Sequence, residues 1–421
     1  MIGLLCFALA VLASPFKSKL RLEGQKCFVV LHPDLVVERS HSRCNDARTP
    51  LPDQQLRFWI MVASREIRLK RRLVGAPVAD NFELATVSVP APALGEVQVK
   101  NLWMSVDPYM RGRMVDRTSY DPQLALGEAT PAREIGEVAA SNSTMYGWRP
   151  PFQLGEALQG GAVGEVVASE DPGFKPGDLV SSMFGWRERF NAPASTVEKL
   201  DTLGLPPQAF LGVAGVTGLT AWGGLLKIAA LKSGDVVFVS AAAGAVGSVA
   251  CQIAKLKGHK VIGSAGGANK CAFLRHIGVD HVIDYKATSN LTDALLRAAS
   301  NGIDVYFDNV GGNHLEAALA AANRFARFVL CGMISQYNTV GLPEGPRNIM
   351  FVIGKCIRLE GLDVANYFNL LPEFHRDLSG WIRDGKLVWK ESVEEGIENA
   401  PRAFLKLFKG ENFGKMLVKL A

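Results

Sequence analysis

The sequence lacks the residues that a disulfide framework or a zinc site needs. Its 421 residues include 7 cysteines and 7 histidines, and no two cysteines stand in a Cys-x-x-Cys pair. Residues 61–250 contain neither residue type. We therefore expect no metal site, and we expect Cys251, Cys271 and Cys331, which fall in apolar segments, to be reduced thiols. Reduced thiols are typical of a cytoplasmic protein.

Strong charge and a membrane-spanning hydrophobic run are also absent. The formal net charge is +5, and no long basic run is present, which argues against a nucleic-acid partner. The apolar run at residues 1–16 has no Lys or Arg before it and is too short to span a bilayer, so no membrane partner is expected. We interpret residues 1–60 either as a targeting segment with a linker or as a non-native extension upstream of a true start at Met61.

Two patterns of hydrophobicity follow along the chain. Residues 74–115 and 147–200 alternate apolar and polar residues between Pro and Gly turns, which predicts a mostly β unit. From about residue 205, short apolar runs alternate with helical patterns, which predicts a doubly wound parallel sheet. The expected strands are 236–240, 260–264, 281–285, 303–310 and 325–332, with helices at 246–257, 269–278, 289–300 and 313–323. The strand-like tail at 411–421 could return to the first unit.

A local repeat interrupts the β unit. Residues 122–141 align without gaps to residues 150–169, and ten of the 20 aligned positions are identical. The second copy keeps the strand pattern GGAVGEVV, whereas the first has PARE where the second has QGGA. We therefore expect the second copy to form the core strand and residues 116–146 to be an insertion outside the sheet. Two similar adjacent strands are the alternative.

The stretch VVFVSAAAGAVGSVACQIA, residues 236–254, lacks one glycine of a dinucleotide-binding turn. Ala242 stands where the pattern G-x-G-x-x-G has its first glycine, and Gly244 and Gly247 keep the other two. Backbone at these glycines can approach a pyrophosphate, and the following helix N-terminus supplies unpaired N–H groups. The alternative is a tight turn with no ligand. The strand before, the helix after and the further strand–helix units favour the cofactor.

The second expected strand lacks the carboxylate that receives the ribose 2′-OH in NAD-binding proteins. No Asp or Glu occurs from Val261 to Ala272, where Ser264, Gly266 and Lys270 stand instead. Tyr285 and Lys286 close the next strand. A hydroxyl, an open backbone and a cation suit a 2′-phosphate, so we infer NADP rather than NAD. The alternative for Lys270 is an ordinary surface residue of the following helix.

Eight motifs give the chain a family resemblance. They are SVDPYMRGRM (105–114), FQLGEALQGGAVGEVVAS (152–169), GVTGLTAWGGL (215–225), AAAGAVGS (241–248), FDNVGG (307–312), CGMISQYN (331–338), RLEGLDV (358–364) and ENFGKMLVK (411–419). Together they resemble the zinc-independent medium-chain reductases of the leukotriene B4 dehydrogenase/prostaglandin reductase type, which include curcumin-reductase-like enzymes. The resemblance covers about 74–115 and 147–421.

The resemblance implies an α/β fold in two domains. One is a GroES-like β-rich catalytic domain, and the other is a Rossmann domain with a doubly wound parallel sheet. The boundaries that we expect are 1–60 for the extension, 61–205 for the catalytic domain with its insertion, 206–388 for the Rossmann NADP-binding domain, and 389–421 for the return to the catalytic domain. A homodimer is implied by analogy alone.

The resemblance also implies an activity and its residues. It implies NADPH-dependent reduction of the C=C bond of α,β-unsaturated aldehydes or ketones, by hydride transfer to the β-carbon and without a metal. Tyr109 and Tyr337 would face this small-molecule substrate, and Tyr337 would either donate the proton or position the cofactor ribose. With Ser264 and Gly266, the expected cofactor-binding residues are Gly244, Ala245, Val246, Gly247, Lys270, Tyr285, Asn309, Cys331, Gly332, Ile334, Ser335, Leu362, Val364 and Asn412.

Two departures from the family pattern leave alternatives open. In MFGWRERF (183–190), Arg189 and Phe190 stand where the family has an aromatic-acidic-Tyr pattern, in a segment that borders the substrate pocket of relatives. The expected insertion lies beside the cleft. A quinone reductase with the same nucleotide site, or an NADPH-binding protein without catalytic activity, are therefore the alternative functions.

Lys270→Ala tests the cofactor preference. Because the lysine would contact only the 2′-phosphate, its loss should weaken NADPH binding by about 1–3 kcal/mol, roughly tenfold to a hundredfold, and leave NADH binding nearly unchanged. Titration of both cofactors against the wild type and the variant measures this. Equal losses for NADPH and NADH would contradict the assignment.

Overall fold

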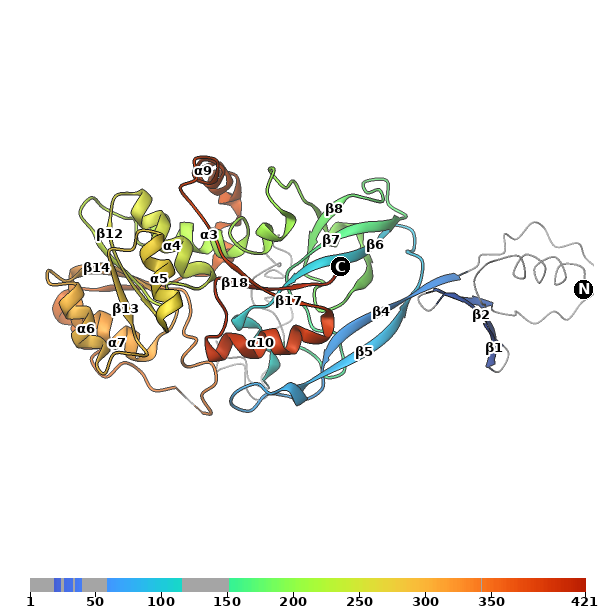
Figure 1. Cartoon of the computed structure of the whole chain (residues 1–421), viewed down its shortest axis with the longest axis horizontal. Coiled ribbons are helices and arrows are strands. Elements are labelled where there is room, and N and C mark those ends of the chain that lie inside the picture. The colour runs from blue at the N-terminus through green and yellow to red at the C-terminus, as the bar shows by residue number, and fades with distance from the viewer. Residues whose placement is uncertain (1–18, 24–25, 33–34, 40–58, 116–150, 342) are drawn as a thin grey trace, which may run out of the picture.

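The computed structural model describes residues 19–23, 26–32, 35–39, 59–115, 151–341 and 343–421, with side chains from Met61 onward. Within these residues the strands form three sheets, with orders β1-β2-β3-β4-β5, β10-β8-β7-β6-β18-β17 (β9 also pairs with β6) and β13-β12-β11-β14-β15-β16. Figure 1 shows the third sheet and its helices at one end of the molecule and the other two sheets at the opposite end. The two ends correspond to a Rossmann and a GroES-like domain.

The third sheet is parallel throughout, and its strand order is that of a Rossmann fold. Taking β11 as the first strand, the order β13-β12-β11-β14-β15-β16 reads 3-2-1-4-5-6. The order reverses between β11 and β14, and in sheets of this kind ligands bind outside the carboxyl ends of the strands at such a point. The strands are β11 (Val236–Val239), β12 (Lys260–Ala265), β13 (His281–Asp284), β14 (Ile303–Asp308), β15 (Ala322–Leu330) and β16 (Arg358–Gly361).

Helices bury both faces of this sheet because its strands are apolar on both sides. Val237, Val239 and Phe307 pack on one face in a cluster with α3, α4, α5 and α9, whereas Phe238 and Tyr306 pack on the other with α6 and α7. The helices are α3 (Val216–Gly223), η6 (Gly224–Ile228), α4 (Ala245–Leu256), α5 (Ala268–His276), α6 (Leu291–Ala298), α7 (Gly312–Ala321), α8 (Phe351–Lys355), η7 (Val364–Leu370) and α9 (Leu371–Arg383).

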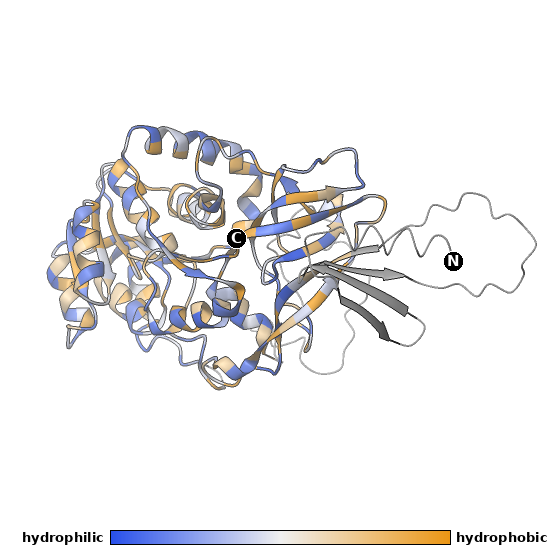
Figure 2. Cartoon of the chain, turned by 45° about the vertical axis from the view of Figure 1, so that its right-hand side comes forward, coloured by the Kyte–Doolittle hydropathy of each residue, from blue (hydrophilic) through white to orange (hydrophobic). Residues whose placement is uncertain are grey.

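The second sheet forms the body of the β-rich domain. Buried and half-buried residues alternate along β8 and β9, and Figure 2 shows hydrophobic and hydrophilic residues in turn along the strands of this domain. This alternation places one face of each strand on the core. The strands are β6 (Glu96–Ser105), β7 (Ala162–Ser169), β8 (Leu179–Ser182), β9 (Arg189–Pro193) and β10 (Glu198–Lys199), and the short helices of this domain are η1 (Ala79–Asn81), η2 (Pro108–Met114), η4 (Ala194–Thr196) and η5 (Pro207–Leu211).

The end of the chain returns to this sheet. β18 (Lys415–Lys419) pairs antiparallel with β6 and parallel with β17 (Glu391–Glu395). Between them, η8 (Ile397–Asn399) leads into α10 (Ala400–Lys409), which packs Phe404 against Phe82 and Trp186. The boundaries that we propose, near residues 205 and 389, fall before η5 and before β17.

The first sheet is an antiparallel meander that extends beyond the family resemblance. β4 (Trp59–Leu69) pairs with β5 (Phe82–Val89) along eight residue pairs. The N-terminal half of β4 also pairs with β3 (Leu35–Arg39), which continues through β2 (Lys26–His32) to β1 (Lys19–Glu23). None of the strands that we expect from the sequence lies in residues 1–60, so β1, β2 and β3 are additional to them.

The five strands and four helices that the sequence predicts after residue 205 are found within a few residues of their expected bounds. The largest difference is the start of β15. The strand begins at Ala322, three residues before the expected start at 325, in a place where the sequence predicts the end of the preceding helix. The second copy of the repeat supplies β7, which pairs with β6 on one side and β8 on the other. The expected insertion, residues 116–146, lies outside the described residues.

A glycine on β7 tests the packing of the second sheet. A Cβ on Gly164 would lie 2.6 Å from Cγ1 of Val99 and 2.7 Å from the carbonyl oxygen of Lys100. Gly164→Ala should therefore lower the free energy of unfolding by about 1–3 kcal/mol, because a packed sheet resists an added methyl. Urea unfolding measures the change. Gly380→Ala is the control, since a Cβ on this α9 glycine meets nothing within 4 Å and alanine favours a helix; equal losses in both variants would contradict the packing argument.

Candidate active site

A tight turn joins β11 to α4 at the carboxyl end of the Rossmann sheet. Ala241 adopts a left-handed conformation, with φ at 46°, and its carbonyl oxygen accepts a hydrogen bond from the Gly244 N–H at 2.9 Å. The Ala242 N–H donates to the carbonyl oxygen of Ser264 on β12 at 2.9 Å. A Cβ on Gly247 would lie 2.4 Å from the Ala241 carbonyl oxygen. Only glycine at 247 lets the helix begin this close to the strand.

The start of α4 is open to an anion. Gly244 is its N-cap residue, and no side chain caps it within the described part of the chain. The N–H groups of the first helical turn, from Ala245 to Gly247, have no carbonyl one turn earlier in the helix to bond. Such a helix start, with its dipole, is the usual place for a phosphate group. The start of α4 thus brings together four predicted cofactor-binding residues, Gly244, Ala245, Val246 and Gly247, at a place suited to a phosphate group.

The C-terminal tail covers this turn. The Gly414 N–H donates to the carbonyl oxygen of Ala243 at 3.0 Å, and Gly414 forms a parallel bridge with Gly244. A Cβ on Gly414 would lie 1.9 Å from the Lys390 carbonyl oxygen, so the tail fits only with glycine there. The side chain of Asn412 binds within the tail, since its Nδ2 donates a hydrogen bond to the Gly414 carbonyl oxygen at 3.1 Å. Gly414 was not among the predicted site residues, although it adjoins the predicted Asn412.

A hollow of about 350 Å³ lies beside the start of α5, with Lys270 on its wall. Nζ of Lys270 donates to the carbonyl oxygen of Gly410 at 2.8 Å. Burial and the positive charge of Lys286 lower the pKa of Lys270. The residues that line the hollow are Gly266, Gly267, Ala268, Asn269, Lys270, Glu411 and Phe413. The positive charges of Lys270 and Lys286 together favour the binding of an anion in this hollow, whereas the negative charge of Glu411 disfavours it.

Tyr285 and Lys286 close over the backbone of Gly266. A Cβ on Gly266 would lie 2.9 Å from the Tyr285 hydroxyl and 2.9 Å from Cε of Lys286. Asp284 fixes this turn, since its Oδ1 accepts hydrogen bonds from the N–H groups of Gly267 and Lys286, both at 3.0 Å. These hydrogen bonds hold the pKa of Asp284 below its ordinary value. Gly266, Lys270 and Tyr285 are thus brought together.

Ser264 is placed differently from the other residues of this group. Its side chain is fully buried, and its hydroxyl has no hydrogen-bond partner among the described residues. A phosphate in the hollow could not reach this hydroxyl without a rearrangement. The sequence could not separate an inward from an outward serine, because neighbouring strand residues point to opposite faces.

Asp308, at the end of β14, organises the backbone that follows this strand. Its Oδ1 accepts hydrogen bonds from the Tyr306 hydroxyl at 2.7 Å, the Ser240 hydroxyl at 3.2 Å, and the N–H groups of Val310 and Gly311 at 2.9 and 2.8 Å. The side chain is fully buried, and burial raises the pKa of Asp308. This carboxyl group was not predicted as a site residue, although the sequence placed it inside FDNVGG.

The predicted residues Asn309, Cys331, Gly332 and Ser335 line the ends of β14 and β15. Asn309 binds Ser240 twice, through its N–H to the hydroxyl at 2.9 Å and through Nδ2 to the carbonyl oxygen at 2.7 Å. The N–H groups of Cys331 and Gly332 both donate to the Asp308 carbonyl oxygen, at 2.9 and 3.0 Å. Burial raises the pKa of Cys331 to about 12, so its thiol is neutral at pH 7.

Three further predicted residues surround these strand ends. The Ile334 N–H donates to the Asn309 carbonyl oxygen at 3.4 Å, and the Leu362 N–H donates to the Leu330 carbonyl oxygen at 3.0 Å. Val364 begins η7, and both Leu362 and Val364 pack on the core cluster of the sheet. Ser335 is joined to Val310 through its hydroxyl, at 2.6 Å.

The two predicted tyrosines lie on segments that an arginine joins. Tyr109 is on η2 and is 42% exposed, and the hydroxyl of Tyr337 accepts a hydrogen bond from the Met333 N–H at 3.3 Å. The buried Arg111, two residues after Tyr109, donates through Nε to Oδ1 of Asn338 at 2.8 Å. The catalytic-domain segment and the Rossmann-domain segment therefore meet next to both tyrosines.

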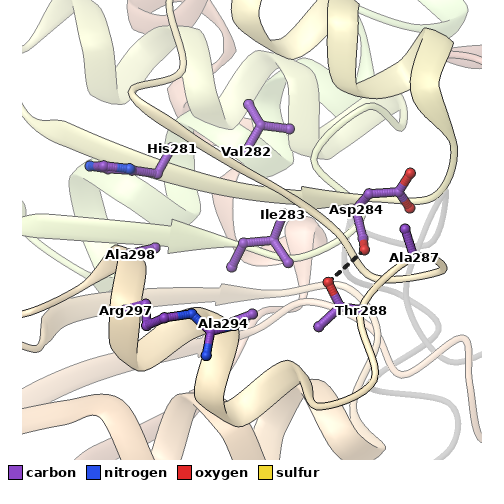
Figure 3. Close-up of a pocket in the computed structure, with 9 residues that line it drawn as sticks. All are labelled: His281, Val282, Ile283, Asp284, Ala287, Thr288, Ala294, Arg297 and Ala298. Atoms are coloured by element: carbon purple, nitrogen blue, oxygen red, sulfur yellow. Dashed lines mark hydrogen bonds between the residues drawn. The ribbon is translucent and has the colours of Figure 1, made fainter.

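A second hollow, of about 370 Å³, lies on the outer edge of the Rossmann sheet between β13 and α6. Figure 3 shows its lining, in which the Thr288 hydroxyl donates to the Asp284 carbonyl oxygen at 2.9 Å. None of the predicted site residues lines it. Because it lies at the β13 edge of the sheet, with β12 between it and β11, we do not assign it to the active site.

No group of three or more His, Cys, Asp or Glu side chains among the described residues is arranged to hold a metal ion. No helix in the same part of the chain is both long and apolar enough to cross a membrane.

Comparison with known proteins identifies the family. A family model described as the N-terminal domain of oxidoreductase matches residues 65–148 and 143–200, and one described as zinc-binding dehydrogenase matches residues 245–378. The NADPH-dependent curcumin reductase of Escherichia coli (strain K12) is 36% identical over 87% of this chain and 98% of its own. The NADP(+)-dependent 2-alkenal reductase of Nicotiana tabacum is 36% identical over 86% and 98%, respectively.

A solved structure agrees with these relatives. The CurA protein from Vibrio vulnificus, in complex with NADPH, is 39% identical and superposes with a TM-score of 0.74 over 85% of this chain and 99% of that one. The chain belongs to the medium-chain dehydrogenase/reductase family of oxidoreductases.

A buried histidine beside Tyr285 makes stability depend on pH. His314, on the first turn of α7, packs edge-on against the Tyr285 ring with centroids 5.3 Å apart, and burial lowers the pKa of His314 to about 4. Below about pH 6.5 the unfolded chain takes up a proton here and the folded chain does not, so stability falls as the pH drops toward 4. From pH 7 to pH 5 the wild type should lose on the order of 2 kcal/mol more than His314→Phe.

Urea unfolding at the two pH values measures this difference. His281→Gln is the control for the loss of a histidine at an exposed position. If His314→Phe and the wild type lose the same stability on acidification, His314 is not the group responsible.

Proposed function

We propose that this protein is an NADPH-dependent reductase of the C=C bond of α,β-unsaturated aldehydes and ketones. The observation that carries the proposal is the switch point of the sheet between β11 and β14, where a turn suited to an anion and the segment of Tyr337 follow the strand ends, in a chain of this family. The relatives named as curcumin and 2-alkenal reductases, matched over nearly their whole length, support the substrate class.

The residues present fit NADPH. The backbone of the turn lies where a Cβ on Gly247 would be. The N–H groups of the first turn of α4 are the groups that would bind a pyrophosphate. Lys270 and Lys286, with Tyr285, would hold the 2′-phosphate over Gly266, and the absence of an Asp or Glu on this part of β12 avoids repulsion. Asn309, the segment from Cys331 to Ser335, and Asn412 would hold the nicotinamide end.

NADPH, when bound, supplies the hydride that reduces the β-carbon of the substrate. Negative charge then develops on the substrate's carbonyl oxygen, and a hydrogen-bond donor held near that oxygen stabilises it. The α-carbon finally takes up a proton, which we assign to the hydroxyl of Tyr337. The Arg111–Asn338 hydrogen bond holds the Tyr109 segment against the Tyr337 segment.

We propose that the reaction needs no zinc, since residues 61–250 contain no His or Cys to supply ligands from the catalytic domain. A cytoplasmic location and a homodimer remain our proposals on the grounds of thiol content and family analogy.

A screen of NADPH oxidation over enals, enones and quinones tests the function. We expect turnover of enals and enones, with the saturated carbonyl compound as the product, and at least tenfold lower kcat/KM for quinones. The screen uses the full chain and a second chain that starts at Met61. Turnover of quinones alone would favour quinone reduction, and NADPH binding with no oxidation on any acceptor would favour a protein without catalytic activity.

Tyr337→Phe tests the proton donor. Removing the hydroxyl should lower kcat by about 10²–10⁴-fold, the usual contribution of a general acid, while the Kd for NADPH changes little. Full turnover with an unchanged KM would show that Tyr337 is not the acid. A raised Kd for NADPH with unchanged turnover of the saturated enzyme would instead assign Tyr337 to positioning the ribose.

A further inference from the structure

A buried ion pair connects the tail to the segment of Tyr109. Nζ of Lys415 lies 2.6 Å from Oδ1 of Asp107, and it also donates to the Val106 carbonyl oxygen at 3.3 Å. The side chains are 5% and 15% exposed. The Ser105 hydroxyl donates to the other carboxylate oxygen of Asp107. Two groups 308 residues apart in the sequence are thus held together inside the protein.

One end of this pair is fixed to the pyrophosphate turn. Lys415 follows Gly414 directly, and Gly414 is bonded to Ala243 and bridged to Gly244. The Lys415 N–H itself donates to the Lys390 carbonyl oxygen at 2.9 Å. The stem of the lysine also lies close to Gly212, since a Cβ there would be 3.4 Å from Cγ of Lys415. The backbone of Lys415 therefore follows any movement of the turn.

The other end of the pair begins the helix that carries Tyr109. Asp107 is the N-cap residue of η2, and its carbonyl oxygen accepts a hydrogen bond from the Met110 N–H at 3.2 Å. Tyr109 and Arg111 are both on η2. Moving the Asp107 carboxylate would therefore move the start of the segment that we expect to face the substrate.

Stability alone does not explain such a pair. Taking both charges out of water costs several kcal/mol per ion, and apolar side chains of similar volume often stabilise a protein as well or better. A buried ion pair does fix the relative position of the two segments that carry it, because losing its geometry leaves an uncompensated charge. The Lys415–Asp107 pair joins two segments that adjoin the cofactor and the substrate.

We infer that Lys415 is a positioning residue that sets the Tyr109 segment according to the state of the pyrophosphate turn. This inference rests on the proposed function, since it takes the turn as the cofactor site. Occupation of the turn fixes Gly414 and Lys415, the ion pair fixes Asp107, and η2 becomes ordered before a substrate arrives. The contact is made by charged groups, so a neutral replacement of the pair loses the coupling even where the fold is kept.

Hydrogen–deuterium exchange of the full chain tests this inference. The probe is 2′-phospho-ADP-ribose, which carries the 2′-phosphate and the pyrophosphate but no nicotinamide, so it cannot touch the substrate side directly. In the wild type, the probe should slow exchange of the amides of residues 109–114 at least fivefold. In Lys415→Met combined with Asp107→Asn, which removes both charges, the probe should still bind within threefold of its wild-type Kd but leave this exchange unchanged.

Two single variants complete the design. Lys415→Arg keeps the charge and should restore at least half of the slowing. Lys419→Met makes the same chemical change as Lys415→Met on the same strand, but at an exposed residue, and should behave as the wild type. In steady-state assays the double variant should raise the KM for an enone about tenfold, with a smaller change in the KM for NADPH.

The outcomes separate the inference from the proposed function. If the wild type binds the probe but exchange at 109–114 does not change, the inference is wrong, whatever the variants do. If the double variant binds the probe and keeps the full slowing, the inference is also wrong. If the wild type does not bind the probe at all, the proposed cofactor site is wrong, and the inference falls with it.

Discussion

The start of α4 lies so close to the end of β11 that residue 247 has no room for a Cβ. The Ala241 carbonyl oxygen would be 2.4 Å from that atom. The turn puts Ala241 in the left-handed region, and the tail pairs with the start of the helix where Gly414 bridges Gly244. The start of α4 and the path of the tail beside it both depend on this close approach.

Hydrophobic patterning is sufficient for most of the Rossmann fold. Strands such as Val236–Val239 are apolar on both sides, and they predict a sheet buried by helices on both faces, as the two core clusters show. The missing first glycine did not prevent recognition of the turn, because the strand before it and the helix after it keep the expected pattern. The left-handed backbone falls one residue earlier, at Ala241, so Ala242 itself needs no positive φ. Three strands at residues 19–39 were not predicted, although Lys19–Glu23 (KLRLE) alternates polar and apolar residues.

Contacts between distant segments could not be predicted in the same way. Nothing near Asp107 in the sequence indicates that its partner is Lys415, and nothing near Arg111 indicates Asn338. The direction of a side chain was also out of reach, as the buried hydroxyl of Ser264 shows. Periodicity reports which face of an element is apolar, whereas register and long-range pairing depend on the whole fold.

The position of β18 has a consequence for how the protein is made. β18, residues 415–419, pairs with Trp103–Ser105 of β6, and it follows every strand of the Rossmann sheet along the chain. A ribosome therefore makes the whole Rossmann sheet before it makes β18. Because domains generally fold as units, the Rossmann unit can fold first, while the edge of β6 at Trp103–Ser105 stays unpaired until β18 emerges. During synthesis this edge of the β-rich domain is therefore open to association with other strands.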